Sequence, residues 1–108
     1  MEDLVELAQD QSFSDLVDNY ETNLLDFFTP SCVICRRLEP MLVAVAREFQ
    51  EVVTFRKINA EAHPEAAVSC TIRGVPSLVL LKQGEVVDRK VGFVSASELR
   101  TWLRGHLS

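Results

Sequence analysis

The sequence has little positive charge, few cysteines and no long apolar segment, and each shortage excludes a class of protein. Its 108 residues carry 11 lysines and arginines against 16 aspartates and glutamates, a formal net charge of −5 at pH 7. Nucleic-acid binding needs a basic surface, so no nucleic-acid partner is expected. No run approaches the roughly 20 apolar residues that span a bilayer, so no membrane association is expected.

Length and composition predict a single globular domain over residues 1–108. Hydrophobic residues make up 47% and charged residues 25% of the chain, the balance of an ordinary folded protein. This length allows one core but not a second. The stretch MEDLVELAQD, at the start, has acidic residues where a secretory signal has basic ones, so we expect a cytoplasmic protein. A monomer is expected.

Cysteine is scarce, and two of the three cysteines, Cys32 and Cys35, lie two residues apart in TPSCVICRRLEP. Zinc would need two further ligands, and Cys70, His63 and His106 are irregularly spaced. A structural disulfide is rare in the cytoplasm, and so short a loop would add little stability. The residues therefore favour a reversible redox couple with no metal or organic cofactor. Cys70 is expected to be a small buried residue, with a regulatory or dimer-forming thiol as the alternative.

Strand and helix patterns alternate along the chain. We expect strands at residues 3–7, 23–28, 52–59, 77–82 and 85–91, and helices at 12–20, 32–49, 63–69 and from 95 or 97 to 107. The order β-α-β-α-β-α-β-β-α predicts an α/β fold with a central mixed five-stranded sheet, flanked by four helices on both faces.

This order places Cys32 between a buried strand and a long helix. The free N–H groups and the positive dipole end of a helix start stabilise a thiolate. Cys35 follows one turn later on the same side of the helix and can reach Cys32. The spacing is typical of an attacking thiol and a resolving thiol.

A series of motifs resembles the thioredoxin family from about Phe13 to Leu107. Besides the cysteine pair, the matching motifs are DFF with Asp26, Pro40 in the long helix, KIN with Lys57, HPEAA, IRGVP with Gly74, Val75 and Pro76, KQGE, and KVGF with Gly92. The resemblance implies the thioredoxin fold and a protein-disulfide reductase. It also implies a flavoenzyme of the thioredoxin reductase type as electron donor and disulfide-containing proteins as substrates.

The resemblance also implies a role for each matched residue. Cys32 would be the exposed nucleophile and Cys35 the buried resolving thiol, and together they would form the redox-active disulfide. Asp26 would accept the proton of Cys35, with Lys57 tuning it, because burial raises a carboxylate pKa toward neutrality. Pro76 would be a cis-proline facing the disulfide. The groove for an extended substrate segment would involve Ser31, Val33, Ile34, Gly74, Val75 and Gly92.

The active site departs from the Trp-Cys-Gly-Pro-Cys of the family. Ser31 replaces the aromatic residue and is expected to cap the helix. Val33 and Ile34 replace Gly-Pro, and the Ile34 N–H, which proline lacks, is expected to point at the Cys32 sulfur and make the couple modestly more oxidising. Two alternatives stay open: a more oxidising thiol oxidase or isomerase, and a binding or scaffold subunit that acts independently of its thiols.

Overall fold

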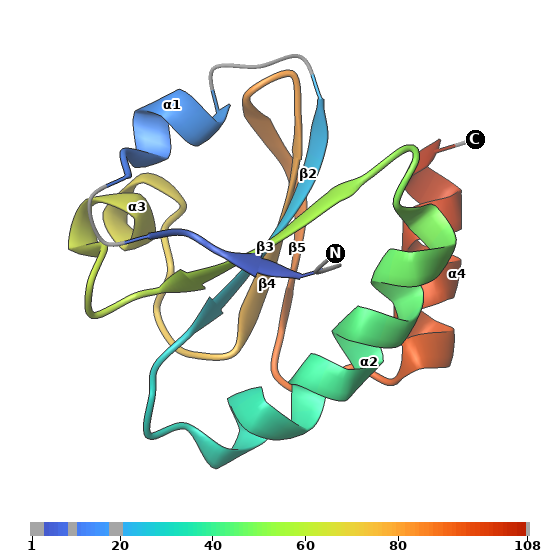
Figure 1. Cartoon of the computed structure of the whole chain (residues 1–108), viewed down its shortest axis with the longest axis horizontal. Helices are drawn as coiled ribbons and strands as arrows, with labels where there is room; N and C mark the ends of the chain where they lie inside the picture. Colours follow the sequence, from blue (N-terminus) through green and yellow to red (C-terminus); the bar gives the residue numbers. More distant parts are fainter. Residues whose placement is uncertain (1–3, 9–10, 18–20, 108) are drawn as a thin grey trace.

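The computed structural model describes residues 4–8, 11–17 and 21–107, which build one five-stranded sheet and four helices (Figure 1). The strands are β1 (Val5–Glu6), β2 (Thr22–Phe28), β3 (Thr54–Asn59), β4 (Ser77–Lys82) and β5 (Glu85–Val91). The helices are α1 (Phe13–Val17), α2 (Val33–Phe49), α3 (Pro64–Ser69) and α4 (Ala96–Leu107). This order confirms the predicted fold class. Residue 3 of the first predicted strand and residues 18–20 of the first predicted helix lie outside the described residues.

The sheet is mixed, with the strand order β1-β3-β2-β4-β5. The strands β1, β3 and β2 are parallel, whereas β4 is antiparallel to β2 and β5 is antiparallel to β4. The parallel strands need crossover connections, which α1 and α2 supply, and the antiparallel pair needs only a tight turn. In this strand order, β2 is the central strand of the sheet.

Neighbouring residues of β2 point to opposite faces, so this strand contributes to two hydrophobic cores. Leu24 packs in a cluster with residues of α2 and α4, and Leu25 and Phe27 pack in a second cluster with residues of α1 and α3. The helices accordingly cover both faces (Figure 1). Because both faces of β2 are buried, apolar residues from both sides of the strand fill the cores, and four of its seven residues are apolar. Asp26, two residues after Leu24, points to the face that α2 covers.

Within the described residues, several element boundaries differ from the predicted ones by one or two residues. Hydrogen bonds explain the start of the third strand and identify the cap of the last helix. The third strand begins at Thr54 rather than residue 52, because the N–H groups of Val52 and Val53 both donate to the Phe49 carbonyl, at 2.9 and 2.8 Å. The chain thus completes a turn after α2 before it becomes extended. Of the two candidate caps of α4, the structure selects Ser95, whose Oγ accepts the Glu98 N–H at 3.1 Å.

The loops that matter for the site gather at one end of the sheet. In the register of the strands, Phe28 at the end of β2 is opposite Asn59 at the end of β3, and Phe27 is opposite Ser77 at the start of β4. Ser77 is in turn opposite Val91 at the end of β5. The segment before α2, the segment before β4 and the segment after β5 therefore share this end.

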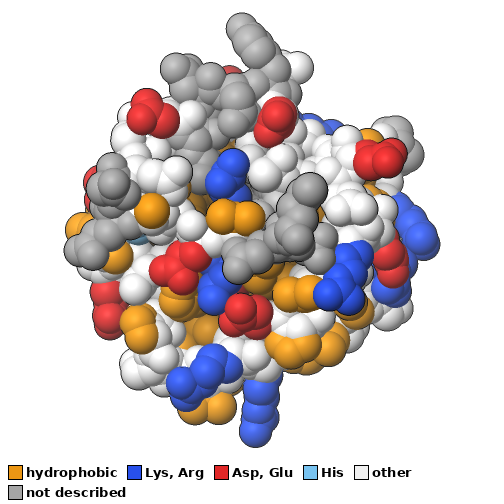
Figure 2. Space-filling view, viewed as in Figure 1, with side chains coloured by type: hydrophobic (Ala, Val, Ile, Leu, Met, Phe, Trp, Pro, Cys, Tyr) orange, Lys and Arg blue, Asp and Glu red, His pale blue; other side chains and the backbone are white. Residues whose placement is uncertain are grey.

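Charged side chains of both signs are interspersed on the face shown in Figure 2. Glu48 of α2 and Arg100 of α4 form an ion pair, with 2.6 Å between Oε2 and Nε. Asp88 of β5 accepts a hydrogen bond from Trp102 Nε1 at 2.7 Å and lies 2.8 Å from His106 Nε2, which ties α4 to the sheet.

Among the helices of the described residues, none has both the length and the apolar character needed to cross a bilayer.

Candidate active site

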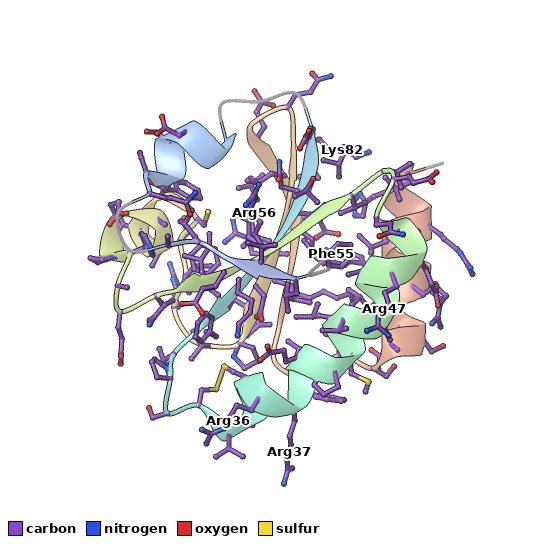
Figure 3. The ribbon with its side chains drawn as sticks, viewed as in Figure 1. Arg36, Arg37, Arg47, Phe55, Arg56 and Lys82 are labelled. Atoms are coloured by element: carbon purple, nitrogen blue, oxygen red, sulfur yellow. A yellow bond between two sulfur atoms is a disulfide. The ribbon has the colours of Figure 1, made fainter. Side chains whose placement is uncertain are left out.

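The two cysteines of the Cys-x-x-Cys stretch form a disulfide at the start of α2. Their Cα atoms are 5.3 Å apart, and the bond is visible in yellow near Arg36 in Figure 3. Cys35 is buried at 4% exposure because it lies on the helix face that packs on the sheet, whereas Cys32 is partly exposed. The two cysteines thus differ in exposure, and Cys32 is the one with surface open to solvent.

Cys32 itself is the residue that caps α2. Its backbone is extended, and its Sγ accepts the N–H of Cys35 at 3.1 Å. The prediction that Ser31 caps the helix is therefore wrong by one residue, and Ser31 is exposed. In this disulfide form the donor to the Cys32 sulfur is the Cys35 amide. The expected contact of the Ile34 N–H concerns the thiolate of the reduced protein, so the more oxidising couple stays a prediction.

Asp26 is a buried carboxylate on the face of β2 beneath α2, with 2% of its surface exposed. Its Oδ1 has no hydrogen-bond partner among the described residues. Burial raises the pKa of Asp26 to about 7, because a charged carboxylate is poorly solvated there; Lys57 lowers this pKa and Glu39 raises it. The carboxyl group can therefore take up or release a proton near neutral pH.

A cavity of about 220 Å³ connects Asp26 with Cys35 and with the surface. Its lining residues are Asp26, Phe28, Thr29, Pro30, Cys35, Arg36, Glu39 and Lys57. Pro30 and Arg36 are exposed, so the cavity reaches solvent. Because a water molecule occupies about 30 Å³ in the liquid, the cavity has room for waters between the buried carboxylate and the buried sulfur.

Lys57 lies directly opposite Asp26 in the register of β2 and β3. Its Nζ is 3.1 Å from Glu39 Oε1 and 4.5 Å from the centre of the Phe28 ring. The structure thus brings together Cys32, Cys35, Asp26 and Lys57 as the resemblance implies. Glu39 was missed by sequence reasoning, although a signal was present, since it follows Cys35 by one helical turn on the same face.

The peptide bond between Val75 and Pro76 is cis, as the resemblance implies. Pro76 is buried, and its carbonyl accepts the N–H of Gly92 at 2.9 Å, which joins the segments before β4 and after β5. Gly92 has a φ of 88°, a conformation that side-chain-bearing residues rarely adopt. A Cβ at Gly92 would have no atom within 4 Å, so backbone conformation, and not lack of space, explains the glycine.

Exposed apolar side chains surround this end of the sheet. Val33 and Ile34 are 55% and 49% exposed on the first turn of α2, and Val91 and Phe93 flank Gly92 at 73% and 51% exposure. Gly74 is exposed and Val75 is partly exposed. Val91 and Phe93 were not among the predicted groove residues, although their position on either side of a predicted one could have indicated them.

Cys70, the third cysteine, is 1% exposed and packs in the core cluster on the α3 side of the sheet. Burial raises the pKa of its thiol to about 11 despite the nearby Arg89, so the thiol stays protonated at neutral pH. This confirms the interpretation of Cys70 as a small buried residue.

A disulfide at a helix start, with one partly exposed cysteine and one buried cysteine that shares a cavity with a buried carboxylate, is typical of a dithiol–disulfide oxidoreductase. Comparison with known proteins agrees: the family model described as Thioredoxin matches residues 4–105. The chain belongs to the thioredoxin family. Over nearly its full length, the chain is also similar to curated proteins named Thioredoxin.

The thioredoxin of Porphyra purpurea is 34% identical over 105 residues, which are 96% of this chain and 98% of that protein. The thioredoxin of Buchnera aphidicola subsp. Acyrthosiphon pisum is 36% identical over 104 residues, 95% of each chain. That of Acidithiobacillus ferridurans is 31% identical over 108 residues, 99% of this chain and all of the relative. The chain is accordingly an enzyme of the protein-disulfide oxidoreductase type.

Proposed function

We propose that this protein reduces disulfides of substrate proteins through a mixed disulfide on Cys32 that Cys35 then resolves. The observation that carries the proposal is the difference in exposure between the two cysteines of one disulfide. An accessible sulfur at a helix start is suited to attack a large substrate, and a buried sulfur is suited to intramolecular attack.

The reaction has two exchange steps. In the reduced protein, the Cys32 thiolate attacks one sulfur of the substrate disulfide, the substrate S–S bond breaks, and the leaving thiolate takes a proton from water. The Cys35 thiol then loses its proton and attacks the Cys32 sulfur. The bond to the substrate breaks, the second substrate sulfur leaves as a thiolate that takes a proton from water, and the Cys32–Cys35 disulfide forms. Two electrons have passed from the protein to the substrate.

Asp26 is proposed as the acceptor of the Cys35 proton. Its pKa of about 7 suits proton uptake at neutral pH, and the cavity that both residues line provides a path through water. Lys57, opposite Asp26 in the sheet, would tune the carboxylate by favouring its charged form.

The substrate segment is proposed to bind across the end of the sheet at which these loops meet. Pro76 has no N–H to compete for the substrate backbone, and the exposed segments on either side offer apolar contacts. The proposed contact residues are Ser31, Val33, Ile34, Gly74, Val75 and Gly92. An extended segment would add main-chain hydrogen bonds there, so specificity would come from side-chain contacts.

The oxidised protein has to be reduced again after each turnover. A flavoenzyme of the thioredoxin reductase type is proposed as the electron donor, and disulfide-containing proteins as the substrates. The cytoplasm is the proposed compartment, because a reductant of disulfides works where the thiol pool is kept reduced.

The test is to trap the intermediate with Cys35→Ser. Serine cannot resolve a mixed disulfide, so the reduced variant mixed with a disulfide-containing substrate protein is expected to accumulate a covalent adduct. Peptide mapping of the alkylated adduct is expected to place the substrate on Cys32. The matched variant Cys32→Ser should form no adduct; an adduct on Cys70, or none with Cys35→Ser, would refute the assigned roles.

A further inference from the structure

Glu39 occupies a place in the site that the proposed function does not use. It lines the cavity shared by Asp26 and Cys35, one turn beyond Cys35 on α2. Its side chain is 40% exposed, whereas Lys57 is 16% exposed and Asp26 is buried. Glu39 therefore stands at the mouth of the cavity, between the buried carboxylate and solvent.

Lys57 is the positive charge that acts on Asp26, but its contacts are with other groups. Its Nζ is 3.1 Å from Glu39 Oε1 and 4.5 Å from the centre of the Phe28 ring. Among the described residues, no ion pair joins Lys57 to Asp26, and the Oδ1 of Asp26 has no hydrogen-bond partner. The ammonium group is thus held toward the cavity mouth by the Glu39 carboxylate.

We infer that Glu39 is a positioning residue, which holds the Lys57 ammonium away from Asp26 and thereby keeps Asp26 ready to accept the proton of Cys35. A direct ion pair between Lys57 and Asp26 would favour the charged carboxylate and make it a weaker base. Glu39 opposes this in two ways, since it draws the ammonium toward itself and places a second negative charge near Asp26. The inference deepens the proposed function and rests on Asp26 being the proton acceptor.

Among the side chains that line the cavity, Asp26 and Glu39 are the acidic ones. The charged or titratable side chains that line the cavity are Lys57 from β3 and Cys35, Arg36 and Glu39 from α2. On the other side of β2, the residue opposite Asp26 is Leu78 of β4, which does not titrate. Arg36 is exposed, and its Nη1 donates to the Pro30 carbonyl at 3.4 Å. Of the two cationic side chains that line the cavity, Lys57 is therefore the less exposed one.

The test is an NMR titration of the Asp26 side-chain carboxyl in the oxidised protein and in Glu39→Gln. The midpoint is expected to fall by about 0.5 to 1 on the pH scale, because loss of the Glu39 charge frees Lys57 to approach Asp26. Glu48→Gln is the matched control, since it removes one negative charge from the same helix at a residue paired with Arg100. Its Asp26 midpoint should match that of the unaltered protein.

The rate of mixed-disulfide resolution supplies the second measurement. In Glu39→Gln the midpoint of the pH profile of this rate should fall by the same amount as the NMR midpoint of Asp26. In a protein that already carries Asp26→Asn, the further substitution Glu39→Gln should leave the pH profile unchanged. An unaltered Asp26 midpoint in Glu39→Gln, or an equal fall in Glu48→Gln, would overturn the inference. If the NMR midpoint falls but Asp26→Asn leaves the rate profile unchanged, positioning by Glu39 is supported and the proposed role of Asp26 in proton transfer fails.

Discussion

Replacing Cys32 with serine is expected to lower the turnover of a disulfide-containing substrate protein by at least about a thousandfold, because a hydroxyl cannot form or exchange a disulfide. Formation of the mixed disulfide should be abolished, because Cys35 is buried and cannot reach the disulfide of a folded substrate. The measurement is the initial rate of substrate reduction with dithiothreitol as the electron donor, corrected for the reaction of dithiothreitol alone.

Cys70→Ser is the matched control for that experiment. Cys70 is 1% exposed and its raised pKa of about 11 keeps the thiol protonated, so it is not expected to take part. Turnover should stay within about twofold of the unaltered protein, apart from any loss of stability from a polar group in the core. Substantial turnover by Cys32→Ser would contradict the assignment of the nucleophile and favour a role independent of the thiols.

Replacing Asp26 with asparagine is expected to stabilise the fold at about pH 8 by about 3–4 kcal/mol. The folded-state pKa of about 7 lies above the ordinary value of 3.8, so the folded protein binds the proton more tightly than the unfolded chain. The unaltered protein therefore loses stability as pH rises from about 3.8 to about 7, where the buried carboxylate becomes charged. Asparagine removes that titration. Urea unfolding at about pH 4 and about pH 8 measures the free energy of unfolding of both proteins, which should differ mainly at the higher pH.

The same substitution should slow resolution of the mixed disulfide near neutral pH by about tenfold to a hundredfold, because general-base assistance to Cys35 is lost. Rapid mixing of the reduced protein with the substrate, followed by acid quenching at a series of times, gives the rates at which the mixed disulfide forms and is resolved. A variant that is more stable yet slower would separate function from folding. Equal rates across about pH 6 to 9 would leave Asp26 as a buried polar residue without a role in proton transfer.

Much of the fold could be predicted because its determinants are local. The apolar run of β2 predicts a strand covered on both faces, and the helical repeat of Leu38, Leu42 and Val45 predicts the buried face of α2. The Gln83-Gly84 turn predicts the hairpin, and both residues have positive φ, as such a turn requires. The cysteine pair was located by its spacing alone.

Other features depend on atoms that sequence spacing does not place. Serine is a common capping residue, yet the first turn of α2 begins one residue later than that preference suggests, so a sulfur accepts the capping N–H. Glu39 resembles an ordinary charged residue of a solvated helix face. Its contact with Lys57 exists because β3 brings that lysine under α2, a juxtaposition between residues 18 positions apart in the chain.

A single turnover of the unaltered, fully reduced protein tests dithiol exchange most directly. The protein is mixed with an equimolar disulfide-containing substrate, quenched with acid, unfolded, alkylated and weighed. The proposed mechanism predicts that the protein loses two hydrogens, that Cys70 alone is alkylated, and that the substrate gains two thiols. A lasting one-to-one adduct, or consumption of the Cys70 thiol in place of Cys35, would contradict it.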